Sequence, residues 1–170
     1  MSNYIQSTYE TCLVCCLLAE ITQINKDIEL DCIIHSLKFS KKDFVGGHLD
    51  FIEKNFNKKL IRIVDNKFYF ENYVEKSTSD LSPVQINKIN LNLINKFIEK
   101  SRIIIYLDNY FLHKEVHFPH FVTILKKADN SYLIYDPWDG NEKVIEGKIL
   151  SKAISSLRNN LKFCPQMIIL

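Results

Sequence analysis

Apolar residues recur every three or four positions in several stretches, the spacing that places them on one face of an α-helix. The stretch 27–37 shows this pattern, and Gly46-Gly47 breaks the chain before the next one. Ser82-Pro83 supplies a capping residue and a first-turn proline, which predicts a later helix with an apolar stripe. The predicted helices cover 12–22, 27–37, 48–56, a segment from Ser82-Pro83 to about Ile98, and 149–157.

Short apolar or alternating runs predict β-strands in the remaining chain. Asp65-Asn66 is the expected turn between the first two, a polar connection covers 77–82, and a five-residue hairpin loop covers 126–130. Helices dominate the first part and strands the last, which predicts an α+β fold with an antiparallel sheet. The predicted strands cover 60–64, 67–74, 102–107, 120–125, 132–135, 141–146 and 166–170.

Composition narrows the class of protein without changing this layout. The 170 residues suit a single domain over 1–170, and 46% hydrophobic with 25% charged residues is ordinary for a globular chain. A net charge of +2 predicts no nucleic-acid or membrane partner. Five cysteines, three of them clustered, indicate free thiols and a reducing compartment. The chain shows no signal peptide, so we expect a cytoplasmic location.

Cys12 lies where a polar loop runs into the first predicted helix. The Thr11 hydroxyl can cap that helix, and the positive end of its dipole favours a thiolate at Cys12. Gln6 lies six residues upstream, and its amide could stabilise an oxyanion that forms beside the sulfur. Cys15 and Cys16 are expected to be ordinary buried cysteines.

His120 and Asp136 lie at the edges of two strands that a hairpin joins. If the loop takes five residues, Leu125 pairs with Ser131, and His120 then lies opposite Asp136. Directly opposed side chains have Cβ atoms about 4.5–5.5 Å apart, so the carboxylate can accept from the imidazole. The chain therefore offers a nucleophile, a base, an orienting acid and an oxyanion donor, in the order Gln, Cys, His, Asp.

Three islands in the sequence resemble the papain-like cysteine peptidases of family thirty-nine, the bacteriocin-processing peptidases and their relatives. These islands are Gln6-x5-Cys12 before an apolar helix, His120-Phe-Val-Thr-Ile-Leu, and Tyr-Asp136-Pro137. The resemblance implies a papain-like fold and assigns Gln6 to the oxyanion hole, Cys12 to the nucleophile, His120 to the base and Asp136 to its orientation. The stretch from Tyr106 to His120 is also similar to the amino-terminal domain of butirosin-type acyltransferases.

Other residues offer alternative roles. His117 is the nearest rival base, and Asp139 or Asn141 could replace Asp136. Trp138 could form a wall of a substrate groove or simply pack. The spacing of His113, His117 and His120 could suggest a metal face, but Pro119 is incompatible with a helix there, so we expect no metal and no cofactor. We expect His35 and His48 to be surface or internally bonded histidines.

The expected activity is hydrolysis of a peptide or isopeptide bond through an acyl-enzyme on Cys12, in which the partner is a peptide or acyl-carrying substrate. Two alternatives stay open. The same residues could transfer an acyl group to an amine, or the domain could be a catalytically inactive module that binds a peptide.

Overall fold

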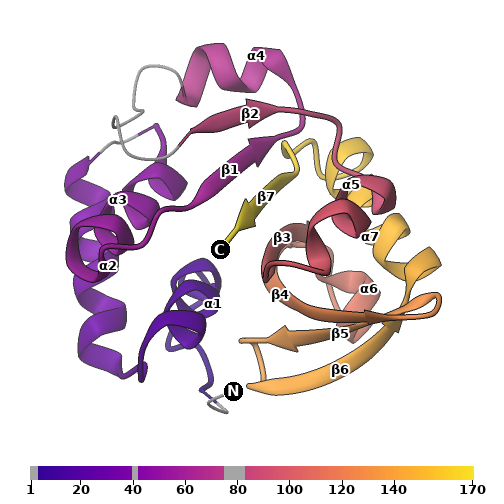
Figure 1. The fold of residues 1–170 in the computed structure, drawn as a ribbon, viewed down its shortest axis with the longest axis horizontal. Coiled ribbons are helices and arrows are strands. Elements are labelled where there is room, and N and C mark those ends of the chain that lie inside the picture. Colours follow the sequence, from indigo (N-terminus) through magenta and orange to yellow (C-terminus); the bar gives the residue numbers. More distant parts are fainter. Residues whose placement is uncertain (1–3, 40–41, 75–82) are drawn as a thin grey trace.

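The computed structural model describes residues 4–39, 42–74 and 83–170 (Figure 1). Its amino-terminal helices are α1 (Cys12–Ile21), α2 (Lys26–Phe39) and α3 (Phe44–Phe56). Short helical turns α4 (Lys67–Tyr69) and η1 (Phe70–Val74) follow, and later helices are α5 (Leu91–Ile98), α6 (Tyr110–His113) and α7 (Gly147–Asn159). The strands are β1 (Ile61–Val64), β2 (Val84–Ile86), β3 (Ile103–Asp108), β4 (Pro119–Ala128), β5 (Ser131–Asp136), β6 (Asn141–Glu146) and β7 (Gln166–Ile169).

The strands form one seven-stranded sheet in the order β2-β1-β7-β3-β4-β5-β6. Every neighbouring pair is antiparallel except β1 and β2, which are parallel. The α+β class predicted from the sequence is therefore confirmed. None of the described helices has the length and apolar character needed to cross a membrane.

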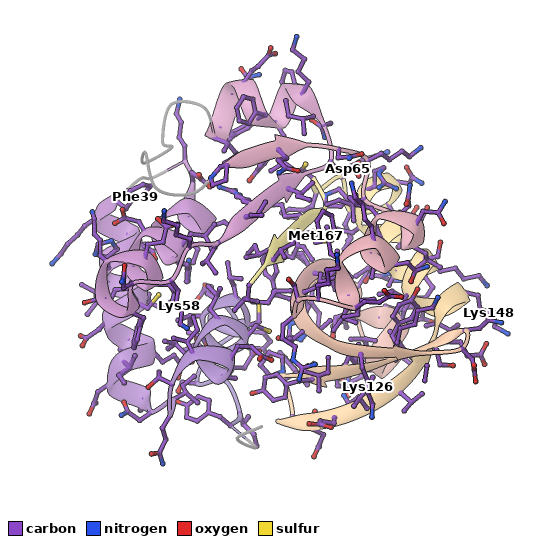
Figure 2. The ribbon with its side chains drawn as sticks, in the orientation of Figure 1. Phe39, Lys58, Asp65, Lys126, Lys148 and Met167 are labelled. Carbon is purple, nitrogen blue, oxygen red and sulfur yellow. The ribbon has the colours of Figure 1, made fainter. Side chains whose placement is uncertain are left out.

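Helices cover both faces of this sheet, and alternating side chains along β3 serve both (Figure 1). Ile103 and Ile105 pack into one core with α5 and α7, whereas Ile104 packs into a second core with α1, α2 and α3. Figure 2 shows Met167 of β7 within the packed interior and Lys148 extending from the periphery. The two cores bring α1, which begins with Cys12, against β3 and β4.

The strand predicted over 67–74 is wrong, because this segment is helical. The sequence predicted that Asp65-Asn66 forms a turn between two strands. Instead, the Asn66 side chain accepts from the Tyr69 N–H and caps the helical turn α4. Phe68 is 70% exposed while Val74 is buried, so the residues do not alternate as a strand would require.

The helix predicted from Ser82-Pro83 is also wrong at its start. Ser82 and the polar connection at 77–82 lie outside the described residues. Val84–Ile86 instead forms β2 at the edge of the sheet, and α5 begins only at Leu91, where the Asn90 side chain caps it. Val84–Ile86, which the sequence pattern assigned to the start of a helix, therefore pairs in parallel with β1 instead.

Gly46-Gly47 does not break the chain but lies in the first turn of α3. Asp43 caps this helix by accepting from the Gly46 N–H. A Cβ atom on Gly47 would lie 2.6 Å from the Cα atom of Ser36, so glycine permits the close approach of α2 and α3. Gly47 therefore serves helix packing rather than a turn, and Gly46 leaves room for the Asp43 cap, whose Oδ2 atom would clash with a Cβ atom there.

The hairpin between β4 and β5 is tighter than predicted. The strands extend to Ala128 and from Ser131, so the five-residue loop is wrong, and Asp129 adopts a left-handed conformation with φ 50°. Thr123 pairs with Tyr135, and the register shifts at an irregularity between Ile124 and Lys126.

Candidate active site

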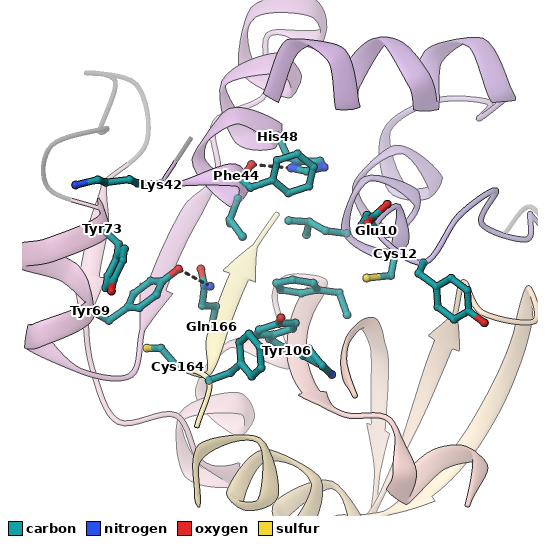
Figure 3. A pocket seen from close by; sticks show the side chains of 16 residues that line it. Glu10, Cys12, Lys42, Phe44, His48, Tyr69, Tyr73, Tyr106, Cys164 and Gln166 are labelled. Carbon is teal, nitrogen blue, oxygen red and sulfur yellow. Dashed lines mark hydrogen bonds between the residues drawn. The ribbon is translucent and has the colours of Figure 1, made fainter. Parts of the chain in front are cut away.

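The first residue of α1 is Cys12, whose side chain directs its sulfur into a groove (Figure 3). Thr11 precedes it but does not cap the helix with its side chain, which corrects the sequence prediction. The Thr11 hydroxyl instead donates to the Thr8 carbonyl at 2.9 Å and accepts from the Thr8 N–H, so it folds the preceding loop back on itself. Cys12 is 6% exposed and lines this groove.

His120 and Asp136 meet as the sequence predicted. The Nε2 atom of His120 lies 2.8 Å from Oδ1 of Asp136, and both side chains are fully buried. Burial lowers the pKa of His120, but the hydrogen bond with Asp136 and the nearby Cys12 thiol outweigh it and raise that pKa to about 9. Because Asp136 occupies Nε2, the thiol can exchange a proton with the ring only through Nδ1.

The contact is right although the predicted register is wrong. Continuing the Thr123–Tyr135 pairing along the strands places Asp136 opposite Val122, two positions from His120. A displacement of two residues keeps a side chain on the same face of a sheet, whereas a displacement of one would have reversed it. The imidazole and the carboxylate bridge the remaining diagonal separation.

The Asp136 carboxylate is also held by two residues that the sequence analysis did not place there. Its Oδ2 atom lies 2.8 Å from Nε2 of His113 and 2.9 Å from Nζ of Lys143, and its Oδ1 atom accepts from the Trp138 N–H. Burial raises the pKa of Asp136, but the bonds with His120 and Lys143 outweigh it and hold that pKa well below its usual range. Asp136 is therefore charged where it meets His120.

Gln6 is anchored beside the end of β5, because its backbone N–H donates to the Pro137 carbonyl at 2.9 Å. Its side-chain Nε2 atom donates to the Thr8 carbonyl at 2.7 Å, so one of the two amide hydrogens is engaged within the loop. The second amide hydrogen is the donor that an oxyanion could use.

A buried carboxylate on α2 holds the loop that carries Gln6, and sequence analysis missed it. The Glu29 carboxylate accepts hydrogen bonds from the Ser7 hydroxyl, from the Ser7 backbone N–H, and from the Tyr4 hydroxyl at 2.6 Å. The Cys15 thiol also donates to Glu29, at 3.4 Å. Glu29 occupies an ordinary helical position in the sequence, so no local pattern distinguishes it from a surface glutamate.

Trp138 packs over the histidine rather than lining the groove. Its ring centroid lies 6.2 Å from that of His120 and 5.2 Å from those of Tyr9 and Phe118. Of the two roles considered for Trp138, the structure shows the packed aromatic, which shields the pair formed by His120 and Asp136 from solvent.

The other candidate residues contact different partners. His117 lies 2.7 Å from Asp108 and stacks on Tyr110, so the rival base belongs to a separate carboxylate. Asp139 pairs with Lys143 at 2.7 Å, and Lys143 in turn contacts Asp136, so it is Asp136 and not Asp139 that bonds to the imidazole of His120. Within the described ranges, no group of three or more histidine, cysteine or acidic residues could hold a metal ion.

His35 and His48 both have internal partners. His35 bonds to Asp50 at 2.7 Å, and Nδ1 of His48 lies 2.8 Å from the Phe44 carbonyl. His48 is fully buried, and burial lowers its pKa to about 4. His48 is therefore neutral near pH 7, and this matters because it lines the groove.

Cys15 and Cys16 are fully buried, as expected from the sequence. Burial raises the pKa of both thiols, so neither forms a thiolate near neutral pH. Cys12 differs from both because its sulfur reaches a cavity. The position of Cys12 at the start of α1, rather than its residue type, sets it apart.

The groove beside Cys12 has a volume of about 440 Å³ (Figure 3). Residues from the loop before α1, from α1 and α3, from α4 and η1, and from β3, β4 and β7 line it. Aromatic rings dominate this lining: Tyr9, Phe44, Tyr69, Tyr73, Tyr106, Phe121 and Phe163. The Cys12 sulfur thus lies between a hydrogen-bonded wall formed by His120 and Asp136 and an apolar groove.

Comparisons with known proteins identified no relative of this chain. No family model matches the chain, and neither curated proteins nor solved structures give a match.

Proposed function

We propose that this protein is a thiol-dependent hydrolase that cleaves a peptide or isopeptide bond through an acyl-enzyme on Cys12. The observation that carries this proposal is the buried bond of 2.8 Å between His120 and Asp136, which leaves Nδ1 of the same imidazole without a hydrogen-bond partner among the described residues and available to the nearby Cys12 thiol, which helps to raise the pKa of His120. A helix that presents a cysteine to a histidine on the facing sheet is the arrangement expected of a papain-like fold, which we infer for this chain.

The chemistry follows from the atoms present. The thiol proton resides on Nδ1 of His120, whose pKa of about 9 keeps it there near pH 7, and the Cys12 sulfur attacks the carbonyl carbon of the scissile bond. The free amide hydrogen of Gln6 donates to the oxyanion, and the tetrahedral intermediate collapses as the amine leaves with a proton from His120. Water then attacks the thioester, His120 accepts its proton, and collapse releases the carboxylic acid and the thiol.

The buried charges favour an enzyme over a binding module that has lost its activity. Asp136 is buried and charged, and such a group is tolerated only when several donors compensate it. Binding a peptide requires no such group at the base of the site. The five cysteines are all free and buried, and we infer from this a reducing, cytoplasmic location.

Alkylation by iodoacetamide tests the proposal directly. We expect peptide mapping to find Cys12 modified at least about 100-fold faster than Cys15 or Cys16, because only a thiolate with access to solvent reacts. His120→Ala should slow the labelling of Cys12 alone. Equal, slow labelling of all three thiols in the folded protein would contradict the proposal and favour a binding module.

A further inference from the structure

The groove lies on one side of Cys12, and the imidazole of His120 lies on the other. Pro119 and Phe121 line the groove, and His120 stands between them in β4. Side chains alternate across a strand, so His120 points away from the face that Pro119 and Phe121 present. Neither His120 nor Asp136 contributes to the groove lining.

This arrangement decides which half of a substrate the groove can hold. The leaving group takes its proton from His120 and therefore departs on the side of the imidazole. The acyl group stays bonded to the Cys12 sulfur, and the sulfur points into the groove (Figure 3). What fills the groove is consequently the acyl half of the substrate.

Away from Cys12, the interior of the groove carries no charge near pH 7. His48 is neutral because burial lowers its pKa to about 4, and burial raises the pKa of Cys164 and Tyr106, which stay protonated. The charged lining residues, Glu10 and Lys42, are exposed at the rim. In Figure 3 the amine of Lys42 points away from the cavity. A charged acyl group would therefore lose its hydration without gaining an opposite charge.

Polar side chains at the far end of the groove bond to one another. The Gln166 side chain accepts from Arg62 at 2.7 and 2.9 Å and donates to the Tyr69 hydroxyl. Arg62 in turn forms a buried bidentate pair with Asp43. A peptide in the groove would bring backbone N–H and C=O groups that need partners. Gln166 and Tyr69 are already engaged, and Nε2 of His48 is the buried lining atom that has no partner among the described residues, so it could serve at most one of these groups. A hydrocarbon chain makes no such demand.

We propose that the groove binds an aliphatic acyl chain, so that the substrate is an amide of a medium-chain fatty acid. This inference rests on the function proposed above for Cys12. If each carbon unit takes roughly the 30 Å³ that a water molecule occupies in the liquid, a chain of about ten carbons fills about two thirds of the cavity of about 440 Å³.

The reaction balances without any further reactant. The Cys12 sulfur bonds to the acyl carbon, the C–N bond breaks, and the amine leaves with the proton that His120 carried. Water hydrolyses the resulting thioester, which yields the fatty acid and restores the thiol. An amine in place of water would give transfer of the chain to a new acceptor.

A series of acyl p-nitroanilides from acetyl to decanoyl tests the chain length. We expect kcat/KM to rise about fourfold per methylene along the series, which corresponds to about 0.8 kcal/mol for each methylene buried. Val45 lines the groove on α3, and Val45→Trp should remove most of the preference for decanoyl over acetyl. Val144→Trp, at a position 72% exposed on β6, is the matched control and should keep it. Thermal unfolding checks that both variants fold.

Binding to Cys12→Ser separates this inference from the proposed activity. Calorimetry with decanamide should show binding that Val45→Trp, in the same background, abolishes, even if no anilide is hydrolysed by the wild type. Hydrolysis of the acetyl and decanoyl anilides at equal rates would overturn the acyl-chain inference and leave the hydrolase proposal standing. A higher kcat/KM for a dipeptidyl anilide with a phenylalanine residue than for decanoyl would also overturn it, in favour of a peptide.

Discussion

The two sides of Cys12 are built in opposite ways. On one side, Asp136 takes hydrogen bonds from His120, His113, Lys143 and the Trp138 backbone at 2.8 to 2.9 Å, each from a fixed direction. On the other side, a cavity of about 440 Å³ is lined mainly by rings that make no specific demand on a ligand. The first side fixes protons and charge, whereas the second offers space and apolar surface.

This difference determines how each side should respond to substitution. Removing one partner from a buried polar network leaves the others unpaired, and the loss is then abrupt. Removing a ring from an apolar groove lowers the buried area in proportion, so the loss is graded. Substitutions in the wall should therefore stop catalysis, whereas those in the groove should change the preference among substrates.

The largest effect is expected at the imidazole. His120→Ala should lower kcat/KM by about 10³-fold or more, because it removes the group that takes and returns the proton in the proposed mechanism. His117→Ala is the matched control, since His117 bonds to Asp108 instead and should change the rate by less than about twofold. The rates on one substrate decide between the two histidines, and a larger loss in the His117 variant would make the rival base the correct one.

The next effect is a loss of stability at alkaline pH. The pKa of His120 is raised from 6.5 to about 9 in the folded protein, so the folded state binds more protons than the unfolded chain between these values. The stabilisation is complete below about 6.5 and is lost as the pH rises toward 9. Urea unfolding at pH 6 and pH 9 should show this loss in the wild type and a smaller one in His120→Gln. An equal pH dependence in both proteins would show that His120 does not hold its proton in the fold.

Comparing the two sides also explains what the sequence could predict. Cys12, His120 and Asp136 were found because local signals mark them: a helix start and two strand edges. The contact between His120 and Asp136 also tolerated an error of two residues in register. Local capping by Asn66, by contrast, overrode the strand pattern that the sequence predicted for 67–74.

His113 and Lys143 carry no local signal for a contact with Asp136. Lys143 pairs with Ile134 across β5 and β6, which brings it to the face of the sheet that Asp136 also uses. His113 comes from the short helix α6. Such contacts depend on the assembled sheet, so spacing along the chain does not reveal them. The groove could not be predicted for the same reason, because its rings come from six separate parts of the chain.

The smallest effect is expected at Lys143, which contacts Asp136 at the solvent-exposed edge of the hydrogen-bonded wall. Lys143 is 25% exposed, so Lys143→Met should lower the free energy of unfolding at pH 7 by about 1 kcal/mol, more than an exposed lysine would. Lys143 helps to hold the pKa of Asp136 low, which stabilises the fold above the ordinary carboxyl pKa of 3.8. Without Lys143 that stabilisation is smaller and disappears at a higher pH as the solution is acidified.

Lys148→Met provides the matched control, because Lys148 pairs only with Glu146 at the surface among the ion pairs of the described chain. Urea unfolding from about pH 7 to pH 2 should show Lys143→Met less stable than Lys148→Met at pH 7, with the two curves converging below the ordinary carboxyl pKa of 3.8. Coincident curves would mean that His113 and His120 alone keep Asp136 charged. Lys143 would then belong to the solvent-exposed surface and not to the wall that orients the imidazole.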